Sequence, residues 1–361
     1  MSETELNNLR NDIANFVDIA RDREIALYEV QSIYRNTIRG LSGRNWDSLK
    51  AKLNGEFNLA KLGELKEKLN KLITSHIYFD DKLISIYTDV KEIQVIKSKL
   101  ETLSFDPKKD LDENITPLEI VELKENFIMF LFGQRRELTV REHIDLDDLK
   151  DSVSDEYQEI IGIKKVPLDC FDSILLDIIN NRVIVSMDLA SVLRRNEINV
   201  IQNNFVHYLK DHFGNNLTNS SQIFDNPLDL FPCIQKFYEE SIDESKLGVI
   251  EINFVTPAGT AHYEKLRGET KDLRTATYHK MGVEGVKNEK APNGKLLNND
   301  ITPYRICMAY YHSTPALEIS LKSSYIAINA TNGSHLYDAS LYGVRSLDDY
   351  NFILEKLLKL R

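Results

Sequence analysis

Cysteine is scarce in this sequence, and its distribution argues against two classes of site. Only three cysteines occur in 361 residues, Cys170, Cys233 and Cys307, and they lie far apart inside apolar segments. A disulfide framework needs paired cysteines, and a structural zinc site needs closely spaced ligands, so neither pattern is present. We expect the three thiols to be buried and to behave as small hydrophobic side chains.

The sequence also lacks apolar runs of bilayer length. Crossing a membrane takes roughly 20 consecutive apolar residues, and no run approaches that length. The opening residues Met1 to Glu5 are acidic and polar, without the basic start and apolar stretch of an export signal. We therefore predict a cytoplasmic protein with no membrane contact. The formal net charge of -11 predicts a surface that repels nucleic acid, except where a local patch is cationic.

The short motifs of common enzymes are missing as well. There is no phosphate-binding glycine loop, dinucleotide glycine fingerprint, Gly-x-Ser-x-Gly elbow or His-Glu-x-x-His pair. His207 and His212 lie five residues apart and would not share a helical face, so we predict no metal site there. No motif indicates a family, a catalytic residue or a particular cofactor.

The first third of the chain carries helical periodicity. Apolar residues alternate three and four apart over 6–37, again from Trp46 to Leu72, and again over 83–103. None of these helices buries its apolar stripe alone, so we predict a helical hairpin or small bundle. The stripes either pack on one another or form a coiled coil, by self-association or with a protein partner.

The next stretch is acidic, with sixteen Asp or Glu against seven Lys or Arg over 105–160. Thr116-Pro117-Leu118-Glu119 has the pattern of a capped helix start, which predicts a helix that carries the apolar run 127–132 as a core helix or an interface. Residues 138–144 alternate loosely and predict a short edge strand. A linker at 145–154 would then separate a helical domain, 1–150, from an α+β domain, 151–361.

The second domain has mainly strand periodicity. Asn180-Asn181 between alternating apolar residues predicts a hairpin, with a helix after Asp188 or Ser191 that ends at Gly214. Further strands are predicted at 249–255, 304–312, 317–322 and 325–329, a turn at Asn332-Gly333, and helices at 228–240 and from Ser346 onward. The predicted fold class is α+β: a helical N-terminal hairpin or bundle, then a mainly antiparallel sheet with flanking helices.

Residues 256–303 form the segment on which a functional prediction depends. Its apolar residues are sparse, and a compact domain seldom contains so long a connection unless it binds something or is disordered. It holds eight Lys or Arg against six Asp or Glu, with interleaved aromatic rings. We predict a long loop that binds a nucleotide or nucleic acid; the alternative is a solvated loop. The candidate ligand-binding residues are His262, Lys265, Arg267, Lys271, Arg274, His279 and Lys280.

Two functional hypotheses follow. The first is a cytosolic, non-catalytic interaction or ligand-binding protein, a subunit of a microbial complex, that uses this segment for an anionic ligand. The second is a metal-dependent enzyme acting on nucleic acid or a nucleotide, with Asp188, Glu251, Glu318 and Lys322 as candidates. Glu318 and Lys322 lie four apart in a predicted strand and therefore share one face, although the acid-to-lysine spacing is not that of the familiar nuclease motif.

Overall fold

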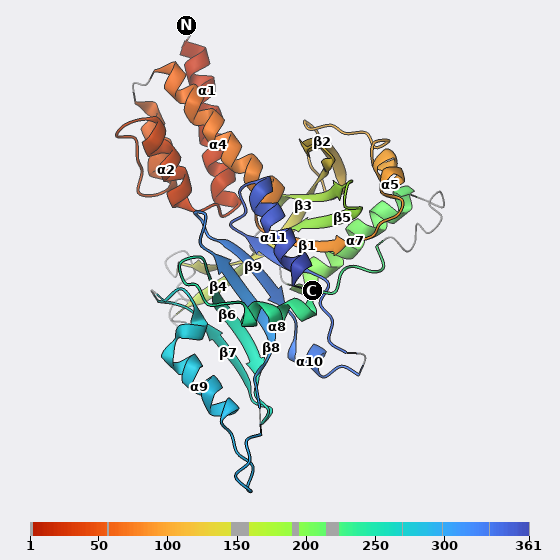
Figure 1. Ribbon diagram of the computed structural model, residues 1–361. Coiled ribbons are helices and arrows are strands. Elements are labelled where there is room, and N and C mark those ends of the chain that lie inside the picture. Colours follow the sequence, from red (N-terminus) through yellow and green to blue (C-terminus); the bar gives the residue numbers. More distant parts are fainter. Residues whose placement is uncertain are drawn as a thin grey trace.

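The computed structural model describes residues 3–55, 58–145, 159–189, 195–213, 224–268, 270–297, 299–331 and 333–360. Within these ranges, packed N-terminal helices are followed by an antiparallel sheet with interspersed helices, which confirms the predicted α+β class (Figure 1). The three cysteines are buried and unpaired, as expected. Among the described residues, no helix is both long and apolar enough to cross a membrane.

The N-terminal helices are α1 (Glu3–Asp22), α2 (Leu27–Thr37), α3 (Trp46–Ala51) and α4 (Leu59–Phe79). The predicted continuous helix over 6–37 is wrong, because the chain turns between α1 and α2 at Glu24, which has a left-handed φ of 55°. Stripe residues such as Val17 on α1 and Leu65 on α4 share one buried core. The helices thus cover their own apolar stripes, and self-association through them stays a prediction.

The sheet has ten strands in the described residues, in the order β2-β3-β4-β5-β1-β10-β9-β8-β6-β7, with every neighbouring pair antiparallel. Strand β1 lies in the middle, between β5 and β10. The strands are β1 (Lys82–Tyr87), β2 (Thr116–Lys124), β3 (Phe127–Ile144), β4 (Ile160–Asp177), β5 (Arg182–Asp188), β6 (Leu247–Val255), β7 (Ala261–Lys265), β8 (Thr302–Tyr310), β9 (Leu317–Lys322) and β10 (Ala339–Tyr342).

Several helices predicted before residue 150 are strands. The predicted helix at Thr116 is β2, the apolar run 127–132 belongs to β3, and 138–144 continues β3 instead of forming a short edge strand. The predicted helix over 83–103 is β1 followed by α5 (Ile93–Leu100). Residues 82–87 and 116–144 of the predicted helical part therefore contribute strands to the sheet. The predicted linker at 145–154 lies outside the described residues, apart from Asp145.

Burial of both sheet faces explains these errors. Met129 and Leu131 of β3 face one core, whereas Phe130 and Phe132 face the other. A strand buried on both sides has a continuous apolar run, which periodicity does not distinguish from a buried helix. Helices α5 and α7 (Arg195–Phe213) pack on one face, and α8 (Phe231–Glu239) and α11 (Leu347–Lys359) pack on the other.

Other local predictions are confirmed. The β4–β5 hairpin turns at Asn181, which has a positive φ of 49°. Ser346 caps α11 by accepting a hydrogen bond from the backbone of Asp349. The strand predicted at 325–329 is wrong: it is the short helix α10 (Tyr325–Ile328), which Ser324 caps. The predicted features at Ser191, Gly214 and Asn332 lie outside the described residues.

The segment 256–303 is not a long loop. It contains β7, a 3-10 turn η4 (Leu273–Thr275), helix α9 (Thr277–Lys287) and an isolated bridge between Lys290 and Leu296. The segment packs tightly against β6, where a Cβ on Gly248 would lie 1.9 Å from the carbonyl oxygen of Lys271. Beyond α9 the chain forms an arm, 288–297, that projects from the body (Figure 1).

Candidate functional site

Two of the seven predicted binding residues are structural. The buried Arg274 guanidinium donates to the Asp272 carboxylate and to the backbone carbonyls of Tyr238 and Glu240. The ring of buried His279 contacts the Glu264 carboxylate and the Tyr238 hydroxyl, each at 2.9 Å. Both side chains therefore tie the segment 256–303 to the rest of the fold.

The remaining five either have different partners or are exposed. Lys265 pairs with Glu251 at 3.3 Å, and the Lys271 ammonium lies 5.1 Å from the Tyr311 ring centroid. The His262 ring stacks on Phe254 with centroids 5.0 Å apart. The other two, Arg267 and Lys280, are exposed. None of the seven lines the cleft described next.

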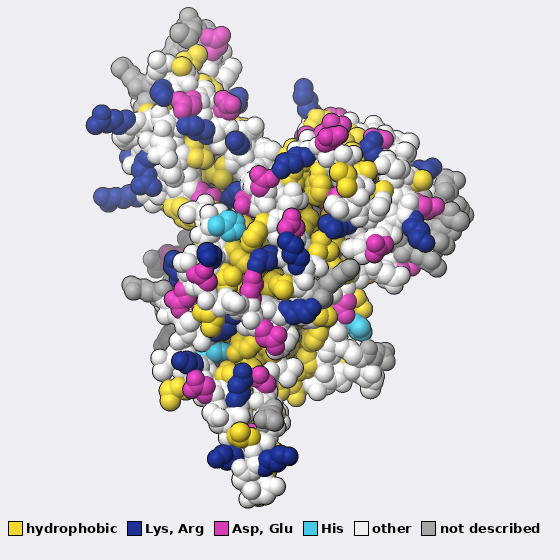
Figure 2. All heavy atoms as spheres, in the orientation of Figure 1, with side chains coloured by type: hydrophobic (Ala, Val, Ile, Leu, Met, Phe, Trp, Pro, Cys, Tyr) yellow, Lys and Arg dark blue, Asp and Glu magenta, His cyan; other side chains and the backbone are white. Residues whose placement is uncertain are grey.

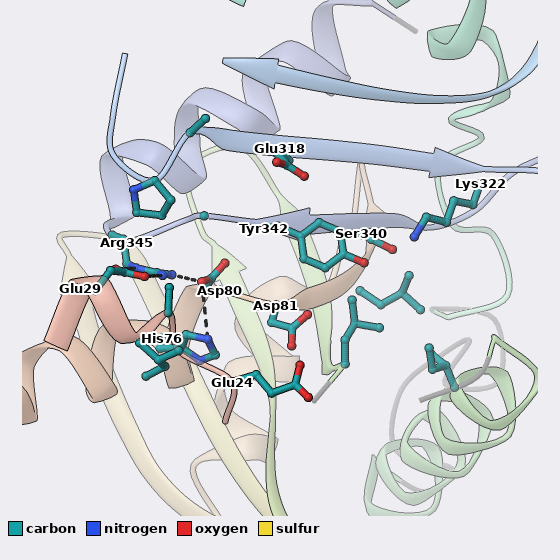
Figure 3. A pocket seen from close by; sticks show the side chains of 18 of the residues that line it. Glu24, Glu29, His76, Asp80, Asp81, Glu318, Lys322, Ser340, Tyr342 and Arg345 are labelled. Carbon is teal, nitrogen blue, oxygen red and sulfur yellow. Dashed lines mark hydrogen bonds and ion pairs between the residues drawn. The ribbon is translucent and has the colours of Figure 1, made fainter. Parts of the chain in front are cut away.

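A cleft of about 470 Å³ lies between the N-terminal helices and the sheet (Figure 3). Its walls come from the α1–α2 turn, the end of α4, the start of β1, the strands β9 and β10, and the first turn of α7. With six carboxylates and two cations, it has a formal charge of -4 when His76 is neutral. The charged lining residues are Glu24, Glu29, Asp80, Asp81, Glu318, Asp338, Lys322 and Arg345.

A layer of buried charges supports the sheet beside the cleft. Asp188 accepts from Arg23 at 2.9 Å and lies 3.5 Å from the Lys82 ammonium. Asp172 pairs with Arg136 and accepts from the backbone N–H of Asp188. Burial alone would raise the pKa of Asp188, but Arg23 and Lys82 hold it well below its usual value. These charges neutralise one another and are not available to a ligand.

The charged side chains on one wall of the cleft also pair with one another. Arg345 pairs with Glu29 at 2.7 Å and with Asp80 (Figure 3). His76 lies 3.6 Å from Asp80, yet burial and the nearby cations Arg23 and Arg345 lower its pKa to about 2. This histidine is therefore neutral at physiological pH, and Arg345 already has two carboxylate partners.

Three other charged residues of the cleft make no salt bridge in the described part of the chain. Glu24, Glu318 and Lys322 form no salt bridge with any residue in the described ranges. Burial raises the pKa of Glu318, and the Lys322 ammonium lies 5.7 Å from the Tyr342 ring centroid. Figure 3 shows Glu24 and Asp81 pointing into the cleft, with Lys322 near its other end.

Two acids of the cleft are among the five non-glycine residues with a left-handed backbone in the described ranges; the other three, Asp89, Asn126 and Asn181, lie outside the cleft. Glu24 and Asp81 have φ values of 55° and 53°, a left-handed conformation that costs free energy for residues other than glycine. Residues with such a strained backbone are frequent at functional sites, and they persist only where the surrounding structure holds them in place. Gly343 closes the cleft nearby, where a Cβ would lie 2.1 Å from the carbonyl oxygen of Ala316.

The four residues of the enzyme hypothesis do not all line one site, although the charges of Glu251 and Lys322 both act on Glu318. Asp188 is neutralised by Arg23 and Lys82, and Glu251 pairs with Lys265, whereas Glu318 and Lys322 do line the cleft together. Among the residues that the structure describes, no group of three or more His, Cys, Asp or Glu side chains is arranged to hold a metal ion.

Sequence reasoning therefore identified two cleft residues, because even spacing along a strand places Glu318 and Lys322 on one face. It missed Glu24 and Asp81, which join the cleft only through tertiary packing. The single local signal for them is their position at a break between regular elements, where a left-handed residue ends a helix or precedes a strand.

The sequence matches no protein-family model, and comparison with curated proteins finds no similar sequence. The function has to be argued from the cleft itself.

Proposed function

We propose that the protein binds a small ligand that carries a positive charge, and that it holds this ligand in the cleft between the N-terminal helices and the sheet. The observation that carries the proposal is the set of carboxylates facing this cavity, of which Glu24 and Glu318 have no salt bridge with the described residues. The proposal keeps the ligand-binding function predicted from the sequence but changes the site and the sign of the ligand charge.

Electrostatics favours a cation. A carboxylate in a partly enclosed site loses hydration, and an ammonium or guanidinium partner compensates for that loss through charge-assisted hydrogen bonds. Burial raises the pKa of Glu318, so a cationic partner would favour its charged form. The Tyr342 ring adds an aromatic face of the kind that attracts organic cations.

Isothermal titration calorimetry with 1,5-diaminopentane tests the proposal. We expect saturable binding to the wild-type protein at neutral pH, and at least about tenfold weaker binding to Glu318→Gln. Because burial raises the pKa of Glu318, binding should also weaken as the pH falls into the mildly acidic range.

Glu137→Gln is the matched control. Glu137 is a carboxylate on β3 that pairs with Lys165 and does not line the cleft, so its loss should leave the affinity unchanged. Absence of saturable binding by 1,5-diaminopentane and by simple guanidinium compounds, or equal affinity in the Glu318→Gln protein, would contradict the proposal.

The second candidate is the anion-binding function predicted for residues 256–303. It is favoured by exposed cations without a salt bridge in the described ranges, among them Arg267, Lys280 and the arm residues Lys290 and Lys295. Figure 2 shows basic side chains at the end of the projecting arm. Fluorescence anisotropy with a labelled single-stranded oligonucleotide tests it: affinity should fall steeply with salt and should be lost when Arg267 and Lys280 are changed to Glu.

A further inference from the structure

The cleft is acidic overall, and Lys322 is one of the two cations that line it. Lys322 is half-buried at the end of β9, and within the described residues it makes no salt bridge. Its ammonium lies 5.7 Å from the Tyr342 ring centroid. A bound carboxylate would give this ammonium the direct ion pair that it lacks among the described residues.

The positive and negative groups occupy different parts of the cavity. Glu24 comes from the α1–α2 turn and Asp81 from the residue before β1, whereas Lys322 ends β9. Along β9, Glu318 and Lys322 lie four positions apart, which corresponds to about 13 Å between their Cα atoms. In Figure 3 the Tyr342 ring lies between the acidic residues Glu24 and Asp81 and the end of the cleft at Lys322.

The other cation of the cleft is not available for a ligand anion. Arg345 already contacts the carboxylates of Glu29 and Asp80, and a ligand anion would have to displace one of them. A ligand that satisfies the whole cavity therefore needs a cationic group for the carboxylates and an anionic group for Lys322.

We propose that the ligand is a zwitterion of the amino-acid type. Its ammonium or guanidinium group is held by Glu24 and Glu318, its carboxylate is held by Lys322, and its carbon chain lies along the Tyr342 ring. This inference rests on the proposed function and narrows it, because a simple cation would use only the acidic part of the cleft.

A series of ligands that differ only in their end groups tests this directly. 5-Aminopentanoate, 1,5-diaminopentane and pentanedioate share one chain length, and calorimetry compares their binding to the full chain. We expect the amino acid to bind at least about tenfold more tightly than the diamine, and the dicarboxylate to bind least. Repeating the series with butane and hexane chains removes chain length as an alternative explanation.

Variants of Lys322 provide the decisive comparison. Lys322→Met should weaken binding of 5-aminopentanoate about tenfold, and Lys322→Glu should reverse the preference so that the diamine binds more tightly. Lys165→Met is the control, because Lys165 lies outside the cleft and pairs with Glu137. Circular dichroism and thermal unfolding confirm that each variant is folded.

The outcomes separate the two proposals. If the diamine binds the wild-type protein as tightly as the amino acid, or Lys322→Met leaves the preference unchanged, the zwitterion is wrong while the cation-binding function stands. If pentanedioate alone binds, the cation-binding function is wrong as well. If no member of any series binds, both are wrong.

Discussion

The segment 256–303 and the cleft both carry many charged residues, but they use these charges differently. In the segment, the buried side chains of Asp272, Arg274 and His279 all have partners within the fold. At the cleft, the buried layer around Asp188 neutralises itself, and Glu24 and Lys322 are left facing a cavity. A charged residue is therefore a candidate for ligand binding only if the fold does not already provide its partner. Counting charged residues in the sequence does not show which of them have such partners.

The largest expected effect is a loss of stability when the layer of buried charges around Asp188 is disrupted. Asp188→Ala removes the shared partner of Arg23 and Lys82 and leaves two buried cations uncompensated. Breaking a buried ion pair on one side costs about 3–5 kcal/mol of unfolding free energy. Urea unfolding should therefore show a large fall in midpoint.

Asp169→Ala is the control for that experiment, because Asp169 pairs with Arg135 at the surface. Exposed pairs contribute little, so its midpoint should stay close to wild type. Equal midpoints for the two variants would show that the buried pairs of Asp188 with Arg23 and Lys82 contribute no more to stability than a surface pair.

A smaller effect on stability is expected for Arg274, which the sequence placed with Lys280 among the candidate ligand-binding residues. Arg274→Ala leaves the buried Asp272 carboxylate and two backbone carbonyls without their donor, which should lower the unfolding free energy by about 2–4 kcal/mol. Lys280→Ala changes an exposed side chain and should leave stability nearly unchanged. If both variants unfold at the same urea concentration, Arg274 is not the structural tie that we describe.

The smallest expected effect is a pH dependence at the wall of the cleft. The pKa of His76 is about 2 in the folded protein, compared with an ordinary value of 6.5. Below pH 6.5 the unfolded chain therefore binds a proton that the folded protein does not, so stability falls as the pH is lowered. Between pH 7 and pH 5.5 this amounts to about 1 kcal/mol.

Chemical unfolding at the two pH values measures this loss, and the His76→Gln protein provides the reference. The variant should lose about 1 kcal/mol less than the wild type over the same interval. An identical pH dependence in both proteins would mean that His76 titrates normally in the folded state.

Helix caps and tight turns could be predicted from the sequence because they depend on a few neighbouring residues. Ser346 begins α11, and Asn181 forms the β4–β5 turn, because capping and left-handed backbone need particular residues. Strand β3 was not predictable, since Phe130 and Met129 are buried on opposite faces and erase the two-residue period. The cleft was beyond reach because Glu24, Asp81 and Lys322 are brought together only by tertiary packing.

The position of β1 has a consequence for how the chain is synthesised. Its two neighbours are β5, about a hundred residues later, and β10, which is more than 250 residues later and ends at Tyr342. During translation, β1 and β5 can pair early, but the other edge of β1 stays without its partner until β10 has left the ribosome. Such an edge readily pairs with other strands, so we expect nascent chains that stop before β10 to aggregate.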